Sequence, residues 1–189
     1  MDVIRSAGEW AERLGESRKG TVVTIGNFDG VHLGHQKILR GVTERARRDH
    51  LSSAVLTFYP HPARVLRPEA APSRLMTLEQ RLAAFEAAGI DATLVLQFDA
   101  ALAKVSAEEF AQRFLVDTLR ARAVLVGGNF RFGHRQVGDD QCSQGTGDAG
   151  RGDGKPHVIL REMQVVAQKV RNENKHGRED KGVDQRHRR

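Results

Sequence analysis

Residues 21–39 of this 189-residue chain, TVVTIGNFDGVHLGHQKIL, combine a strand pattern, a glycine-rich turn and the start of a helix. Residues 21–25 are largely β-branched, which favours a buried strand of an α/β sheet over a helix. Gly26 ends that run, and the glycines at 30 and 34 allow a tight turn and a close approach to a ligand. Apolar residues at helical spacing follow, and they predict a helix that ends near Arg48.

This unit places two imidazoles, those of His32 and His35, on either side of a helix N-terminus. The first N–H groups of a helix have no internal partner and the helix dipole is positive there, so the unit is predicted to bind an anion such as phosphate. Each imidazole can donate a hydrogen bond to a phosphate oxygen and adds positive charge when protonated, while Lys37 can assist from the next turn.

Other interpretations of the histidine pair were weighed against phosphate binding. A histidine near a helix start is often a cap or a surface residue, and His-x-x-His can form half of a metal site. Zinc needs three or four ligands, and the only cysteine, Cys142, lies in a very different stretch, so no metal site is predicted. The Walker A phosphate loop is absent from the sequence.

Residues 26–35, Gly-Asn-Phe-Asp-Gly-Val-His-Leu-Gly-His, resemble the His-x-Gly-His signature of the nucleotidyltransferase superfamily. The fuller pattern is similar to the FMN adenylyltransferase module of prokaryotic bifunctional FAD synthetases. Asp29 is predicted to brace the turn rather than to act as a base. The positions that the resemblance implies for ATP and phosphate binding are Gly26, Asn27, Phe28, Asp29, Gly30, Gly34 and Lys37.

A second motif lies at Phe58–Pro62, where Phe-Tyr-Pro-His-Pro follows a predicted strand over residues 53–58. Four prolines between Tyr59 and Met76, two of them in this motif, predict a loop without regular structure, which the residues alone would describe as a stiffened surface connection. Phe-x-Pro-His-Pro resembles a motif of the same family that shapes the flavin pocket. The resemblance therefore implies flavin binding by Phe58, Pro60, His61 and Pro62.

A third motif, Gly-Gly-Asn-Phe-Arg-Phe-Gly, follows the strand predicted over residues 123–126. Its amide can hydrogen bond to a base or flavin edge, its arginine can meet phosphate and its rings can stack, although a turn with a cation packed on a ring would look the same. Gly-x-Asn/Asp-Phe-x-Phe-Gly resembles a further FAD synthetase motif. It implies roles at the flavin and reacting phosphates for Asn129, Phe130, Arg131 and Phe132.

The remaining periodicity predicts another strand over residues 93–98 and three further helices: one from Ser6 to Leu14, one capped by Thr77 that ends at Gly89, and one capped by Ser106. Phe110, Phe114 and Leu115 are predicted core residues of the last helix. Together with the resemblance, this order implies an α/β, Rossmann-like nucleotidyltransferase fold, with a parallel sheet flanked by helices and incomplete at its C-terminal end.

Charged residues make up 29% of the chain and hydrophobic ones 39%, with no apolar run near the ~20 residues needed to span a bilayer and no signal-peptide core at the start. A cytoplasmic protein is expected. The net charge of +6 divides into 19 Lys/Arg against 16 Asp/Glu in residues 1–139 and 11 against 8 in residues 140–189. Because the basicity is concentrated in the tail, no nucleic-acid surface is predicted.

The composition changes after residue 139, where a glycine-rich, small-polar stretch resembles a linker. The family pattern should continue with a Val/Ile-Ser-Ser-Thr-x-Ile-Arg motif and a riboflavin kinase module, and neither is found in the sequence. We therefore predict an FMN adenylyltransferase-like domain over residues 1–139 and an atypical, largely disordered tail over 140–189. A truncated or frameshifted reading frame would explain the change.

The resemblance implies transfer of AMP from ATP, accompanied by Mg²⁺, to FMN, giving FAD and pyrophosphate, with His32, His35 and Asn129 as the catalytic residues. Small molecules are the expected partners, without nucleic acid or membrane, and the sequence carries no signal for an oligomeric state. One alternative is a truncated remnant that binds nucleotide or flavin without catalysis. Another is a different acceptor, phosphopantetheine or a nicotinamide nucleotide, against which the second and third motifs argue.

Overall fold

The computed structural model describes residues 1–14, 19–127 and 157–158. Its sheet has the strand order β1-β4-β3-β2-β5-β6, and all neighbours pair in parallel except β5 and β6, which are antiparallel. The strands are β1 (Asp2–Ile4), β2 (Thr21–Ile25), β3 (Ser52–Tyr59), β4 (Ala92–Gln97), β5 (Ala121–Val126) and β6 (His157–Val158).

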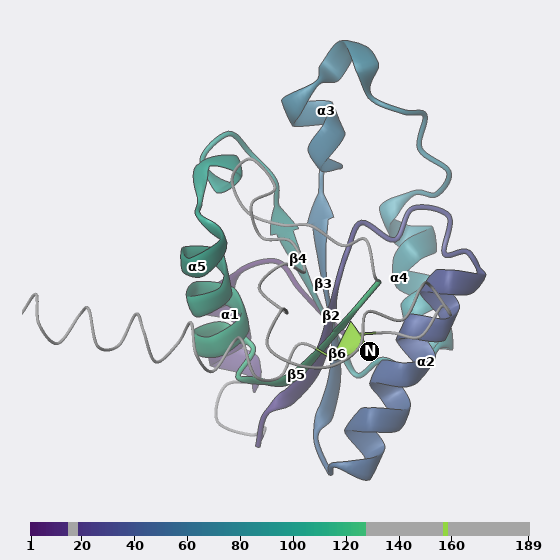
Figure 1. Cartoon of the computed structure of the whole chain (residues 1–189), viewed down its shortest axis with the longest axis vertical. Helices are drawn as coiled ribbons and strands as arrows, with labels where there is room; N and C mark the ends of the chain where they lie inside the picture. The colour runs from purple at the N-terminus through teal and green to yellow at the C-terminus, as the bar shows by residue number, and fades with distance from the viewer. Residues whose placement is uncertain (15–18, 128–156, 159–189) are drawn as a thin grey trace, which may run out of the picture.

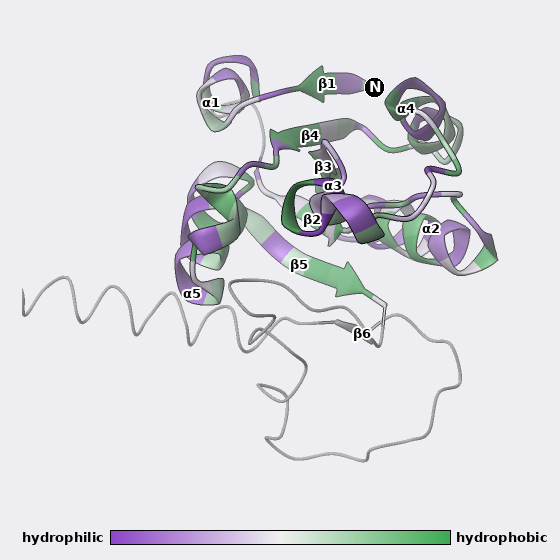
Figure 2. Cartoon of the chain, turned by 90° about the horizontal axis from the view of Figure 1, so that it is seen from above, coloured by the Kyte–Doolittle hydropathy of each residue, from purple (hydrophilic) through white to green (hydrophobic). Residues whose placement is uncertain are grey.

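Helices cover both faces of this sheet, so the described chain forms three layers (Figures 1 and 2). One face carries α1 and the α5 region, the opposite face carries α2 and α4, and α3 lies beyond the ends of β3 and β4. The helices are α1 (Ala7–Leu14), α2 (Leu33–Arg48), α3 (Pro62–Leu66), α4 (Leu78–Ala87), α5 (Ala107–Phe110), the 3-10 turns η1 (Pro68–Ala70) and η2 (Leu102–Lys104), and the π-helix η3 (Ala111–Thr118).

The two faces of the sheet bury separate hydrophobic clusters. In β2 every residue is buried, and alternate side chains divide between the clusters: Val23 and Ile25 face α1 and α5, whereas Val22 faces α2 and α4. Strands that are buried on both faces in this way are typical of parallel sheets. The predicted parallel α/β fold flanked by helices is therefore confirmed.

The predicted secondary structure agrees closely with the observed elements around β2. The signature helix ends at Arg48 as predicted, and Thr77 caps α4 through a complete capping box with Gln80. Phe110, Phe114 and Leu115 are buried as expected. The helix that Ser106 caps continues as the π-helix η3, in which Thr118 Oγ1 donates to the Arg113 carbonyl five residues earlier at 2.7 Å.

The prediction of a loop without regular structure from Tyr59 to Met76 was wrong, because α3 and η1 form within it. Each of these turns begins with a proline, Pro62 and Pro68. Proline is well tolerated at the first helical position, where its missing N–H would have no partner in any case. The prolines in this segment therefore start short helices instead of preventing them.

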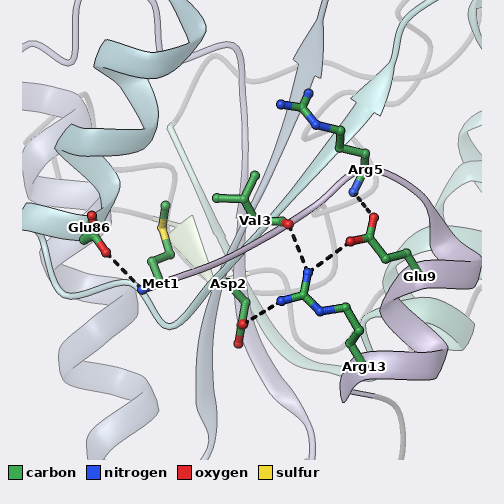
Figure 3. Close-up of polar contacts among 7 residues, drawn as sticks. All are labelled: Met1, Asp2, Val3, Arg5, Glu9, Arg13 and Glu86. Carbon is green, nitrogen blue, oxygen red and sulfur yellow. Dashed lines mark hydrogen bonds and ion pairs between the residues drawn. The ribbon is translucent and has the colours of Figure 1, made fainter.

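Two strands were not predicted from the sequence, β1 and β6. β1 has only three residues and lies at the edge of the sheet, where it pairs with β4. Its position is fixed by Arg13 of α1, whose guanidinium contacts the Asp2 carboxylate at 3.1 Å and the Val3 carbonyl at 3.3 Å (Figure 3). β6 extends the sheet beyond β5 and comes from the predicted tail.

The central cluster predicts a specific loss of stability. Leu56 in β3 is fully buried against α1 and α5, so Leu56→Ala should lower the free energy of unfolding by about 2–5 kcal/mol through lost burial and the cavity left behind. Leu33 is 81% exposed, and Leu33→Ala should change it by less than about 0.5 kcal/mol. Urea unfolding at pH 7 measures both, and equal losses would contradict the assignment of Leu56 to the core.

Candidate functional site

The order of the strands places a binding site at the end of β2. Successive crossovers run from β2 to β3 and on to β4, but β5 returns to the other side of β2, so the direction of winding reverses between β2 and β5. Open α/β sheets bind ligands outside the carboxyl ends of their strands at such a reversal. The loop that leaves β2 there carries residues 26–32.

His32 is the N-cap of α2, so the histidine pair lies across the helix start as predicted. Its Nδ1 accepts a hydrogen bond from the Gly34 N–H at 3.2 Å, and the neutral ring then carries its proton on Nε2, where it can be donated to a ligand. A Cβ on Gly34 would lie 3.1 Å from Cε1 of the His32 ring. Gly34 therefore makes room for the capping imidazole.

A column of stacked rings connects His32 to the core. The ring of His35 stacks on that of His32 with centroids 3.8 Å apart, and the Phe28 ring lies 5.1 Å below His35. Phe28 in turn meets the fully buried Phe85 edge to face at 5.2 Å. Phe28, which we predicted at the phosphate, thus has its ring in the core, where it supports His35.

Burial and the neighbouring His32 lower the pKa of His35 to about 4, against the opposing effect of the Asp29 charge. His35 is therefore neutral at pH 7 and acts through hydrogen bonds rather than through charge. Its Nδ1 is buried without a hydrogen-bond partner among the described residues, and so is Oδ1 of Asn27 in the loop before α2. Buried polar atoms without partners are costly, and these two, one in the loop and one in the first turn of α2, mark a place where a ligand would supply the missing bonds.

Asp29 braces the loop, as predicted. Its carboxylate accepts hydrogen bonds from the N–H groups of Leu75, at 3.0 and 3.1 Å, and of Met76, at 2.9 Å. Burial alone would raise the pKa of Asp29, but these two N–H donors outweigh it and lower the pKa. Gly30 follows with φ +84°, a backbone conformation that favours glycine, and a Cβ there would also displace the exposed Leu75 side chain, whose Cδ1 would lie 2.9 Å away.

The second motif meets the first through His61. His61 caps α3, with Nδ1 accepting the Ala63 N–H at 3.1 Å, which repeats the geometry of His32. Burial lowers the pKa of His61, against an opposing effect of the nearby Asp29 charge. Pro62 begins α3 and, like Pro60, is half-buried, whereas Phe58 packs edge to face on Phe98 at 5.7 Å, on the face of the sheet opposite α2.

Other predicted positions differ in how closely they approach this loop. The Gly26 N–H donates to the Leu56 carbonyl at 3.1 Å and so extends the pairing of β2 with β3. Lys37 is exposed on α2, one turn beyond the histidine pair. Four predicted residues lie outside the described part of the chain: Asn129, Phe130, Arg131 and Phe132.

Sequence reasoning missed Arg81, which lies buried beneath the loop and is only 6% exposed. Its Nη1 donates to the Asn27 carbonyl at 2.6 Å and to Thr57 Oγ1 at 3.1 Å, and its Nη2 donates to the Phe58 carbonyl at 3.5 Å. A signal was present, because Arg81 falls within the apolar stripe formed by Leu78, Leu82 and Phe85 on α4. An arginine in such a stripe is either buried or part of a site.

Within residues 1–14, 19–127 and 157–158, no group of three His, Cys, Asp or Glu side chains is arranged to hold a metal ion. In the same ranges, no helix has both the length and the apolar composition needed to cross a bilayer.

The sequence model of the FAD synthetase family matches residues 14–167. This match extends beyond residue 139, where the FMN adenylyltransferase-like domain is predicted to end. The bifunctional riboflavin kinase/FMN adenylyltransferase of Escherichia coli (strain K12) is 38% identical over 130 residues, covering 69% of this chain and 42% of that protein. The protein of the same description from Pseudomonas fluorescens is 43% identical over 134 residues, covering 71% and 43%. The chain thus spans about two fifths of the length of these curated relatives.

Among solved structures, the crystal structure of a macrolide-efflux protein from Streptococcus pneumoniae is similar, with a TM-score of 0.57 and 25% identity. The similarity covers 70% of this chain and 43% of that one, and it supports the α/β fold described above.

The brace made by Asp29 can be tested by amide hydrogen exchange. Asp29→Ala should speed exchange of the Leu75 and Met76 amides by roughly tenfold, since each loses a charge-assisted bond of about 1.5 kcal/mol. Because the pKa of Asp29 is lowered in the folded protein, the brace is intact at pH 7 and is lost as the pH falls through that lowered value. Asp99→Ala, which removes a comparable bond to the Leu102 N–H, is the matched control and should leave both amides unchanged.

The neutrality of His35 can be followed by NMR. Its Cε1 proton should titrate near pH 4 in the folded protein and near the ordinary value of 6.5 in urea. Between these values the unfolded chain binds more protons than the folded one, so stability should fall as the pH decreases from 6.5 towards 4, and His35→Gln should reduce that fall. A midpoint near 6.5 in the folded protein would contradict the burial of this ring.

Proposed function

Because this chain belongs to the FAD synthetase family, we propose that it is an FMN adenylyltransferase, which transfers AMP from ATP to FMN and releases pyrophosphate. The observation that carries the proposal is the stacked pair of His32 and His35 at the start of α2, where the winding of the sheet reverses. Helix dipole, free N–H groups and imidazole donors converge there, as a triphosphate requires.

In the proposed reaction a phosphate oxygen of FMN attacks the α-phosphorus of ATP. A new P–O bond forms, the bond from that phosphorus to the bridging oxygen of the β-phosphate breaks, and pyrophosphate leaves with the electron pair. No covalent bond to the protein is needed, so catalysis consists of positioning and of stabilising charge on the oxygens. The Nε2–H of His32 is proposed to donate to a phosphate oxygen; the cap at Gly34 and the stacking of His35 on the ring support this role.

The flavin is proposed to lie beside the second and third motifs, with Phe58, Pro60, His61 and Pro62 on one side and Asn129, Phe130, Arg131 and Phe132 on the other. Support comes from the position of His61, which caps α3 and lies close enough to Asp29 for the carboxylate charge to act on the pKa of His61. Asn129 is proposed to orient the flavin phosphate. With His32 and His35, it makes up the proposed set of catalytic residues. The use of ATP supports a cytoplasmic location.

Mg²⁺ enters this proposal as the companion of ATP. The described residues do not form a magnesium cage, because Asp29, the carboxylate of the loop, already bonds the N–H groups of Leu75 and Met76. Magnesium commonly keeps several waters and binds through substrate phosphates, so no described residue is assigned to hold it.

A second candidate is a protein that binds nucleotide or flavin without turnover. It is favoured by the change in composition after residue 139, where a glycine-rich, small-polar stretch stands in place of the family's Ser-Ser-Thr-x-Ile-Arg motif. We further propose the division at about residue 139 between an FMN adenylyltransferase-like domain and a tail, within a family match that runs to residue 167.

The two candidates are separated by incubating the chain with ATP, Mg²⁺ and FMN and measuring FAD by chromatography. We expect FAD from the wild type, and a loss of about 10²–10³ in kcat in His32→Asn, which keeps a capping acceptor for Gly34 but lacks the imidazole donor. His35→Ala should also reduce kcat. His50→Asn, which replaces an exposed imidazole beyond the opposite end of α2, is the control.

Binding of ATP or FMN without any FAD would favour the second candidate. FAD formation that survives both His32→Asn and His35→Ala would overturn the assignment of the histidine pair.

A further inference from the structure

We propose that Arg81 is a positioning residue of the phosphate site, an inference that rests on the proposed function. Its guanidinium joins the loop after β2 to the carboxyl end of β3 and places a positive charge against the backbone of the loop that carries the capping His32. Neither role is visible in the signature motif, because Arg81 lies 46 positions after His35, on α4.

The contacts of Arg81 converge on the two segments that carry the capping histidines. Asn27, whose carbonyl Arg81 holds at 2.6 Å, lies five residues before His32, and Phe58 lies three residues before His61. Thr57 Oγ1 supplies a third acceptor at 3.1 Å from within β3. The planar fork of a guanidinium can donate in these directions at once, so one side chain fixes the loop after β2 against the carboxyl end of β3.

The charge of Arg81 lacks a direct counterion among the described residues. All three of its acceptors are uncharged. The carboxylates of Asp29 and Glu79 act on it through space, and that of Asp29 bonds the N–H groups of Leu75 and Met76. Burial lowers the pKa of Arg81, yet an arginine remains charged at neutral pH. A buried cation without an ion pair is costly, and a bound polyanion above it would provide the missing counter-charge.

A purely structural role would show itself as lost stability alone, so the test measures anion binding and turnover separately. Arg81→Met removes the charge, and Arg81→Lys keeps the charge but cannot reach both carbonyls. Arg122→Met is the matched control, because Arg122 is exposed in β5 beside Gly20, at the amino end of the sheet. Thermal melts first establish the temperature at which each variant is folded.

Pyrophosphate, a product of the proposed reaction, probes the charge without any turnover. By calorimetry at low salt, Arg81→Met should weaken pyrophosphate binding roughly tenfold, the order expected for one unit charge near a polyanion at an effective dielectric constant of about 20. Arg81→Lys should stay within about threefold of the wild type and Arg122→Met should not change. Wild-type affinity in folded Arg81→Met, or no binding by the wild-type chain, would overturn the inference.

Positioning is tested by Arg81→Lys, which also serves if Arg81→Met does not fold. We expect kcat for FAD formation to fall at least about tenfold while KM for ATP changes little, as for an interaction made in the transition state. The amide resonances of Gly34 and Ala63, which report on the two histidine caps, should shift together. Wild-type kcat with unshifted amides would overturn the positioning role.

The two proposals fail in different ways. If neither the wild type nor any variant forms FAD but Arg81→Met still weakens pyrophosphate binding, the proposed function fails and Arg81 remains part of an anion site. If the wild type forms FAD and the Arg81 variants match it in pyrophosphate affinity and kcat, only the inference about Arg81 fails.

Discussion

The parallel pairing of β2 with β3 on one side and β5 on the other is the constraint on which the rest of the structure depends. It buries all five residues of β2 and forces the connecting helices onto opposite faces, which creates two separate clusters of apolar side chains. It also places the carboxyl end of β2 where the direction of winding reverses. The loop that begins at Gly26 can therefore meet a ligand while its base remains in the centre of the sheet.

The geometry of that loop is held largely from α4. The capping box of Thr77 and Gln80 fixes where the helix begins, and the two residues just before it, Leu75 and Met76, present their N–H groups to Asp29. One turn into the helix, Arg81 holds the carbonyl of Asn27. These restraints maintain a backbone with φ of +51° at Phe28 and +28° at Val31, conformations that side chains other than glycine seldom adopt.

Much of the fold could be predicted because its central elements follow strong local rules. The β-branched run of β2, the apolar periodicity of α2 and the capping residue of α4 each specify their element from neighbouring residues. β1 could not be predicted, since three residues are too few for a pattern and its partner β4 lies about 90 positions away. The error at α3 came from counting prolines without regard to their position in the first turn.

The residues of the candidate loop could be named from the sequence, but most of their contacts could not. Sequence reasoning identified His32, His35 and Asp29, and it assigned Asp29 its bracing role. It could not show that Phe28 turns into the core or that Gly34 accommodates an imidazole, because both depend on side chains brought together by the turn. Arg81 is a long-range case, and its contacts exist only once β2, β3 and α4 have assembled.

The N-cap formed by His32 links the start of α2 to a single proton. An imidazole can accept the Gly34 N–H only while its Nδ1 carries no hydrogen, so the doubly protonated ring cannot serve as a cap. The same is true of His61 and the first turn of α3. Adding a proton to either ring would therefore release a helix terminus as well as add a charge, and the local order of both helix starts becomes a direct record of the protonation state of the site.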